Sequence, residues 1–201
     1  MSEPPVNSLS QLVQMLAKGL RPQLDKPFAF FGHSLGALLS FELAKEIRRE
    51  SGLLPLHLFV SARVAPQTNC PGAPIHALPE PAFLKEIRRL NGTPREVFNV
   101  PELLELIIPV LRADFALNET YSYLPDPLLE CPITAFGGLQ DDSTTPEGLE
   151  AWRYQTKYAF ALRMLPGDHF FINSARPLLL RILHGELQKL VTQAASKVSE
   201  W

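Results

Sequence analysis

The pentapeptide GHSLG, residues 32–36, centres Ser34 between two glycines. Apolar residues precede it in PFAFF, residues 27–31, and a helical pattern follows it in residues 35–51. A sharp strand-to-helix turn of this kind projects a serine hydroxyl from the carboxyl end of the strand, where the oxygen can attack a carbonyl carbon. The start of the helix would also offer the N–H of Leu35 to the oxyanion that forms. This context favours a nucleophilic serine over a serine in an ordinary turn.

A serine nucleophile needs an imidazole base and an acid that orients the imidazole, in the chain order serine, acid, histidine for this kind of turn. Among the five histidines, His169 in LPGDHFF follows the last predicted strand, at the same end of the sheet as Ser34. The acid is expected after the strand in PITAFGGLQDD, which offers both Asp141 and Asp142. We favour Asp141, which the loop reaches first. We expect the side chain of His33 to point away from the Ser34 hydroxyl and to be structural.

Strands and helices that could position these residues alternate along the chain. Apolar runs predict strands at 27–31, 56–66, 131–138 and 160–165, and helical periodicity predicts helices at 9–20, 35–51, 146–156 and 174–198. Strand, helix and strand in this order indicate parallel pairing through right-handed crossovers. Between about 71 and 127 the alternation stops, and several helical segments follow, including an apolar one interrupted by Pro109. The sequence therefore predicts one α/β domain over 1–201, a mostly parallel sheet flanked by helices, with a helical insertion.

Composition excludes several classes of protein. The chain is 46% hydrophobic and 20% charged, with a formal net charge of -2, which is typical of a globular protein and offers no basic surface for nucleic acid. The two cysteines, Cys70 and Cys131, lie far apart and predict no disulfide framework, which favours a cytoplasmic protein. No secretion signal and no membrane-spanning segment is recognisable.

Taken together, these segments resemble the stand-alone type II thioesterases of nonribosomal peptide and polyketide synthesis, which are α/β-hydrolases. The resemblance rests on PFAFFGHSLGALLSFELA, LFVSARVAP, LNGTP, LRADF, PITAFGGLQDD and LPGDHFF, and it covers nearly the whole chain. It implies Ser34 as nucleophile, His169 as base and Asp141 as acid, with no cofactor or metal, and residues 71–127 as a lid over an acyl pocket. It also implies hydrolysis of acyl groups from the phosphopantetheine arm of acyl- or peptidyl-carrier domains, which clears misprimed or stalled synthases.

The N-terminus departs from this family. Its members begin with an apolar strand and a glycine-rich loop, then a helix and a second strand, whereas residues 1–26 here predict one helix and contain a single glycine, Gly19. We therefore expect an N-terminally truncated α/β-hydrolase whose strand before Ser34 lies at an open sheet edge, which could pair with another chain. Leu35 would then be the only identified oxyanion donor, and losing one donor slows such reactions by on the order of 10²–10³. The oligomeric state is left open.

Two other functions fit the same residues. Serine, histidine and aspartate act together in many hydrolases, so a general carboxylesterase or lipase is one alternative. A truncated, non-catalytic protein that binds acyl carriers is the other. The apolar residues 103–111 are equally consistent with lining an acyl pocket and with packing the insertion onto the sheet.

Overall fold

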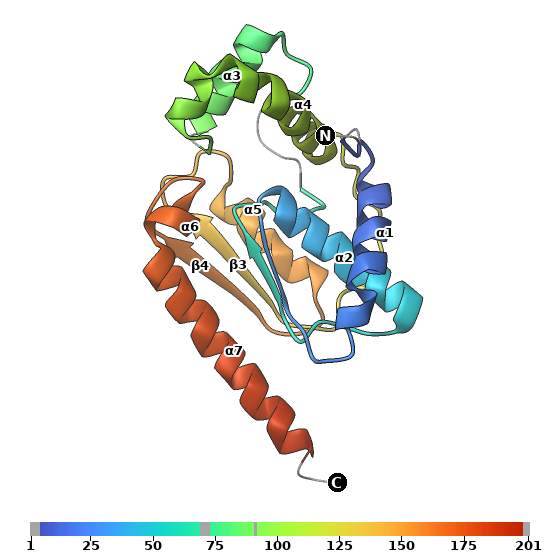
Figure 1. The fold of residues 1–201 in the computed structure, drawn as a ribbon. Coiled ribbons are helices and arrows are strands. Elements are labelled where there is room, and N and C mark those ends of the chain that lie inside the picture. Colours follow the sequence, from blue (N-terminus) through green and yellow to red (C-terminus); the bar gives the residue numbers. More distant parts are fainter. Residues whose placement is uncertain (1–4, 69–72, 91, 199–201) are drawn as a thin grey trace.

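The computed structural model describes residues 5–68, 73–90 and 92–198 (Figure 1). Its sheet has four strands in the order β1-β2-β3-β4, and every neighbouring pair is parallel. The strands are β1 (Phe30–His33), β2 (Leu58–Ser61), β3 (Ile133–Gly138) and β4 (Phe160–Leu165). The predicted parallel α/β sheet is therefore confirmed. Because all pairs are parallel, the carboxyl ends of the four strands lie at the same end of the sheet.

Helices connect and flank these strands. They are α1 (Leu9–Leu20), α2 (Leu35–Ser51), α3 (Glu80–Leu90), α4 (Pro101–Glu119), α5 (Pro146–Glu150), α6 (Phe171–Ser174) and α7 (Arg176–Val198), with short 3-10 helices η1 (Arg21–Gln23), η2 (Arg95–Asn99) and η3 (Ala151–Gln155). The predicted start of the first helix is confirmed, because the Ser8 side chain accepts a hydrogen bond from the N–H of Gln11 at 3.4 Å.

Alternating side chains of the strands divide the core between two faces of the sheet. Leu58 and Val60 of β2 pack with Phe41 of α2 and with Trp152, whereas Phe59 packs with α6 and α7. Helix α1 forms a further layer on α2 (Figure 1). Helices thus cover both faces, as the sequence predicts.

Three predicted strands have different bounds in the structure, the third of them only at its start, which moves from 131 to Ile133. The first shifts from 27–31 to Phe30–His33, because the hydrogen-bonded ladder with β2 continues up to His33. The second shortens from 56–66 to Leu58–Ser61. Its chain leaves the sheet at Ala62, which has a φ of 52° that no regular strand adopts. An apolar run shows which residues are buried but not where backbone pairing ends.

The helical insertion, defined here as α3, η2 and α4, stands above the carboxyl ends of the strands (Figure 1). Phe83, Ile87 and Ile108 are buried in a cluster made of residues of the insertion and of the loop before it. These apolar residues therefore pack chiefly within the insertion and not on the sheet.

Helix α4 runs through Pro109 without a break, which corrects the predicted interruption. Proline removes one backbone hydrogen bond from a helix, here the bond to the carbonyl four residues earlier. Pro109 lies on the exposed side of α4, where water can bond that carbonyl, and the buried Ile108 beside it holds the helix on α3.

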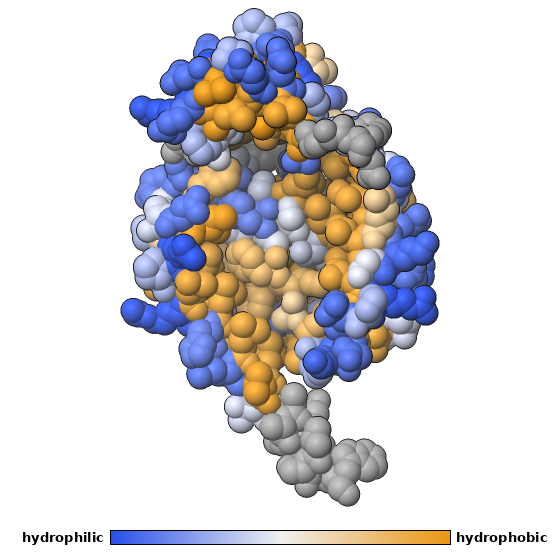
Figure 2. All heavy atoms as spheres, viewed as in Figure 1, coloured by the Kyte–Doolittle hydropathy of each residue, from blue (hydrophilic) through white to orange (hydrophobic). Residues whose placement is uncertain are grey.

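Strand β1 lies at an edge of the sheet, as expected, and among the described residues it pairs with β2 alone. The side chain of Phe31 is 41% exposed there. Apolar side chains spread over this face of the molecule (Figure 2). No helix in the described ranges is long and apolar enough to cross a membrane.

Candidate active site

Ser34 occupies a sharp turn between β1 and α2. Its φ of 55° and ψ of -120° are unusual for a residue with a side chain, and its N–H donates to the carbonyl of Ser61 at 2.7 Å. Such a conformation costs about 1–3 kcal/mol and is found mostly at functional sites. The turn ends where α2 begins, so the N–H of Leu35 lies in the first helical turn, where no carbonyl of the helix can accept from it.

The two glycines beside Ser34 differ in what they permit. A Cβ atom at Gly32 would lie 2.0 Å from the carbonyl oxygen of Gly36, so β1 and α2 approach too closely for any side chain there. A Cβ atom at Gly36 would meet no atom within 4 Å among the described residues. The close approach therefore requires glycine at position 32 but not at position 36.

Asp141 and His169 come together at the carboxyl ends of β3 and β4. The Nδ1 atom of His169 lies 3.0 Å from Oδ2 of Asp141, which is only 8% exposed. Asp142 is exposed and bonds no histidine, and Asp168 instead accepts from the N–H of Phe170. Burial raises the pKa of Asp141, but hydrogen bonds from His169 and Ser143 outweigh this effect and lower it. The carboxylate beside the imidazole is therefore ionised at neutral pH.

A cavity of about 1050 Å³ lies between the carboxyl ends of the strands and the helical insertion. Figure 2 shows the molecule hollowed below the insertion. Ser34 and His169 both line this cavity, together with Leu90, Leu111 and Phe115 of the insertion. In the part of the chain that the structure describes, no hydrogen bond joins the Ser34 hydroxyl to His169. The cavity thus brings the predicted nucleophile and base to one space, next to apolar side chains.

Sequence reasoning missed the contribution of Ser143. Its hydroxyl donates to Oδ1 of Asp141 at 2.6 Å and lies 2.8 Å from Nδ1 of His169. Its backbone N–H donates to the same carboxylate oxygen at 2.9 Å. An aspartate followed two residues later by a serine favours this local turn, so the pattern DDS at 141–143 carried the signal.

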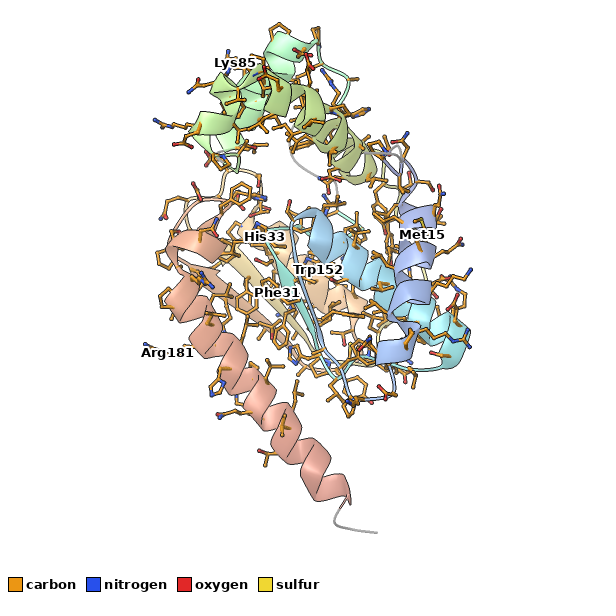
Figure 3. The ribbon with its side chains drawn as sticks, in the orientation of Figure 1. Met15, Phe31, His33, Lys85, Trp152 and Arg181 are labelled. Carbon is orange, nitrogen blue, oxygen red and sulfur yellow. The ribbon has the colours of Figure 1, made fainter. Side chains whose placement is uncertain are left out.

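His33 is also closer to the site than the sequence indicated. Its Nδ1 lies 3.0 Å from the hydroxyl of Ser61, and its ring centre is 5.1 Å from that of His169. Figure 3 shows His33 at the end of the sheet that faces the helical insertion. Burial, and then the positive charge that His169 can carry, lowers the pKa of His33 to about 4. His33 is therefore neutral at physiological pH and adds no positive charge beside His169.

Within the described ranges, no group of three or more histidine, cysteine, aspartate or glutamate side chains is placed to hold a metal ion. A hydroxyl on a strained turn, an imidazole and a buried ionised carboxylate are the groups used in acyl transfer through a serine.

Known proteins share this fold and sequence. A model of the thioesterase domain family matches residues 1–187. The gramicidin S biosynthesis protein GrsT of Aneurinibacillus migulanus is 46% identical over 187 residues, which cover 93% of this chain and 73% of the relative. Two solved structures are similar. The RedJ thioesterase of the prodiginine pathway in Streptomyces coelicolor has a TM-score of 0.85 at 40% identity, over 92% of this chain and 73% of its own. ClbQ of the colibactin NRPS/PKS pathway has a TM-score of 0.87 at 29% identity, over 94% of this chain and 80% of its own.

The family model covers most of the chain, and the relatives match in both sequence and backbone. These solved structures have the α/β-hydrolase fold, and the parallel sheet and flanking helices of this chain match that fold. The chain therefore belongs to the thioesterase domain family and is a serine hydrolase of the α/β-hydrolase fold.

Proposed function

We propose that this chain hydrolyses acyl thioesters held on the phosphopantetheine arm of acyl- or peptidyl-carrier domains, with Ser34, His169 and Asp141 as the catalytic triad. The observation that carries the proposal is the bond of 3.0 Å between His169 and Asp141, at the wall of the cavity that also holds Ser34 on its strained turn. The relatives GrsT and ClbQ, named for a gramicidin S and a colibactin NRPS/PKS pathway, support a role in clearing such assembly lines.

The reaction follows from the chemistry of the three side chains. Nε2 of His169 takes the proton of the Ser34 hydroxyl as Oγ bonds to the thioester carbonyl carbon, and Asp141 stabilises the imidazolium that forms. The N–H of Leu35 faces the developing oxyanion. The carbon–sulfur bond then breaks, and the thiolate, a good leaving group because thiols have a pKa of about 8.5, takes the proton from His169 and leaves as the thiol, which returns His169 to its neutral form. His169 next activates water, which releases the acyl group as a carboxylic acid and restores the Ser34 hydroxyl.

The cavity is large enough for an acyl substrate. Its volume of about 1050 Å³ lies just above the range of roughly 300–1000 Å³ found for small-molecule sites. Leu111 and Phe115 offer apolar contacts to an acyl chain. In this proposal residues 71–127 act as a lid over the bound acyl group. The lid and the sheet belong to a single domain.

Competing substrates test the proposal. We expect kcat/KM for acetyl- and longer acyl-loaded carrier domains to exceed that for small oxygen esters with the same acyl groups, and a Ser34→Ala variant to lose the activity. Faster hydrolysis of the small esters would instead indicate a general carboxylesterase. Binding of the carrier without turnover, and without labelling of Ser34 by a serine-reactive phosphonate, would indicate a non-catalytic protein. Either result would overturn the proposal.

A further inference from the structure

We propose that Ser143 is a positioning residue that holds the proton of neutral His169 on Nδ1 and so leaves Nε2 free to accept the proton of the nucleophile. This inference rests on the proposed function of His169 as base. It concerns a side chain that lies outside the triad and that is 26 residues from His169 in the chain.

The Ser143 hydroxyl sits between the two members of the acid–base pair. Its oxygen lies 2.6 Å from Oδ1 of Asp141 and 2.8 Å from Nδ1 of His169. The other carboxylate oxygen of Asp141, Oδ2, lies 3.0 Å from the same Nδ1. Nδ1 therefore faces two oxygens at once, and Ser143 contacts both partners while Thr144 contacts only Asp141, at 3.2 Å.

Counting protons fixes the direction of these bonds. An ionised carboxylate only accepts hydrogen bonds, so the single hydroxyl proton of Ser143 goes to Asp141. The short oxygen–oxygen distance of 2.6 Å is typical of a hydroxyl bonded to a charged acceptor. The Ser143 oxygen then presents a lone pair to His169, as does Oδ2 of Asp141. Two acceptors facing Nδ1 require a proton there, and the lone pair of the neutral ring is left on Nε2.

The local backbone holds Ser143 in this place. Its N–H donates to Oδ1 of Asp141 at 2.9 Å, which closes a turn directly after β3. The loop that carries His169 approaches closely, because a Cβ atom at Gly138 would lie 2.6 Å from the carbonyl oxygen of Gly167, and this carbonyl accepts a hydrogen bond from the N–H of Gln140 at 2.9 Å. The hydroxyl and the imidazole thus lie on two loops that are hydrogen-bonded to each other.

Ser143 also lines the cavity, so a direct contact with substrate is the competing role. The two roles differ in their kinetic effect. Loss of a group that positions the base lowers kcat and leaves KM nearly unchanged, whereas loss of a uniform substrate contact raises KM.

The test combines kinetics with nuclear magnetic resonance of the full chain. The variants are Ser143→Ala, Ser143→Cys and Ser143→Thr, with Ser51→Ala as a matched loss of a remote hydroxyl. Because a hydrogen bond to a charged group contributes about 1.5–3 kcal/mol, we expect the alanine and cysteine variants to lower kcat by roughly 10- to 100-fold with KM within twofold. Threonine keeps the hydroxyl and should restore kcat to within a few-fold, and the Ser51 variant should match the wild type.

The ring nitrogens of His169 give a readout that needs no substrate. The enzyme is labelled with 15N-histidine and measured at a pH at which the His169 ring is neutral, and the His169→Gln variant assigns the signals. We expect the Nδ1–H tautomer in the wild type and in Ser143→Thr. Ser143→Ala and Ser143→Cys should show a larger share of the Nε2–H form. An unchanged tautomer, a rise in KM without a fall in kcat, or a threonine variant as slow as alanine would overturn the inference. Absence of carrier hydrolysis in the wild type would contradict the proposed function alone, since the tautomer is measured in the free enzyme.

Discussion

Alanine at the two glycines of the pentapeptide should have opposite effects on stability. In Gly32→Ala the new Cβ atom would lie 2.0 Å from the carbonyl oxygen and 2.3 Å from the carbonyl carbon of Gly36. These are backbone atoms of α2, so the contact is relieved only if the turn that carries Ser34 moves. Overpacking usually lowers the free energy of unfolding by about 1–3 kcal/mol, and we expect Gly32→Ala to lie at the upper end of this range, about 3 kcal/mol. In Gly36→Ala the Cβ atom meets no described atom within 4 Å.

Gly36 also lies inside α2, where alanine favours the helix over glycine by up to about 1 kcal/mol. We therefore expect Gly36→Ala to raise the free energy of unfolding by about 0.5–1 kcal/mol. Labelling of Ser34 by a serine-reactive phosphonate should be unchanged in this variant, and it should slow markedly in Gly32→Ala because the serine is displaced from its base.

Urea unfolding followed by tryptophan fluorescence measures both stabilities under the same conditions. Equal losses in the two variants would refute the reasoning, because they would mean that glycine is needed equally at both positions. Wild-type stability and labelling in Gly32→Ala would refute it as well, since β1 and α2 could then not be as close as described.

The other predictions concern the acid, a buried histidine and the core. Asp141→Asn should lower kcat by about 10⁴-fold while the fold is kept, and the exposed neighbour in Asp142→Asn should leave kcat within twofold. His57 is buried with a pKa lowered to about 4 by that burial, whereas unfolded histidine binds a proton below about pH 6.5. The free energy of unfolding should therefore fall by up to about 3 kcal/mol for this residue as the pH drops from 6.5 to 4, and a His57→Gln variant should lose less over that window. Trp152→Phe should lower the free energy of unfolding by about 2–4 kcal/mol, because the indole is fully buried and donates to a backbone carbonyl at 2.8 Å. Tyr154→Phe is the control: its side chain is 67% exposed, and the free energy of unfolding should change by less than about 0.5 kcal/mol.

Local sequence was sufficient for the elements with a strong pattern. The bounds of α2 and β4 agree with prediction, because a capped periodic helix and a short apolar run between polar loops each have one good conformation. The predicted end of β2 and the predicted interruption of α4 at Pro109 were wrong. Both depend on neighbours in space, namely the partner strands in one case and the packing of α4 on α3 in the other.

The candidate site shows the same division. Ser34 and His169 could be proposed from the sequence because each follows a predicted strand in a loop with glycine. Asp141 was favoured over Asp142 because the loop reaches it first, but the sequence does not show which of the two carboxylates the turn after β3 directs toward His169. Ser143 was missed because its contact with His169 joins two loops that only the folded sheet brings together.

Trapping of the acyl-enzyme tests the central claim most directly. The enzyme would be mixed with an acyl-loaded carrier domain, quenched in acid within the first turnover, digested and mapped by mass spectrometry. We predict a mass increase equal to the acyl group on the peptide that contains Ser34, and none in the Ser34→Ala variant. An acyl group on a different residue, or release of acid by Ser34→Ala at the wild-type rate, would contradict the assignment of Ser34 as the nucleophile.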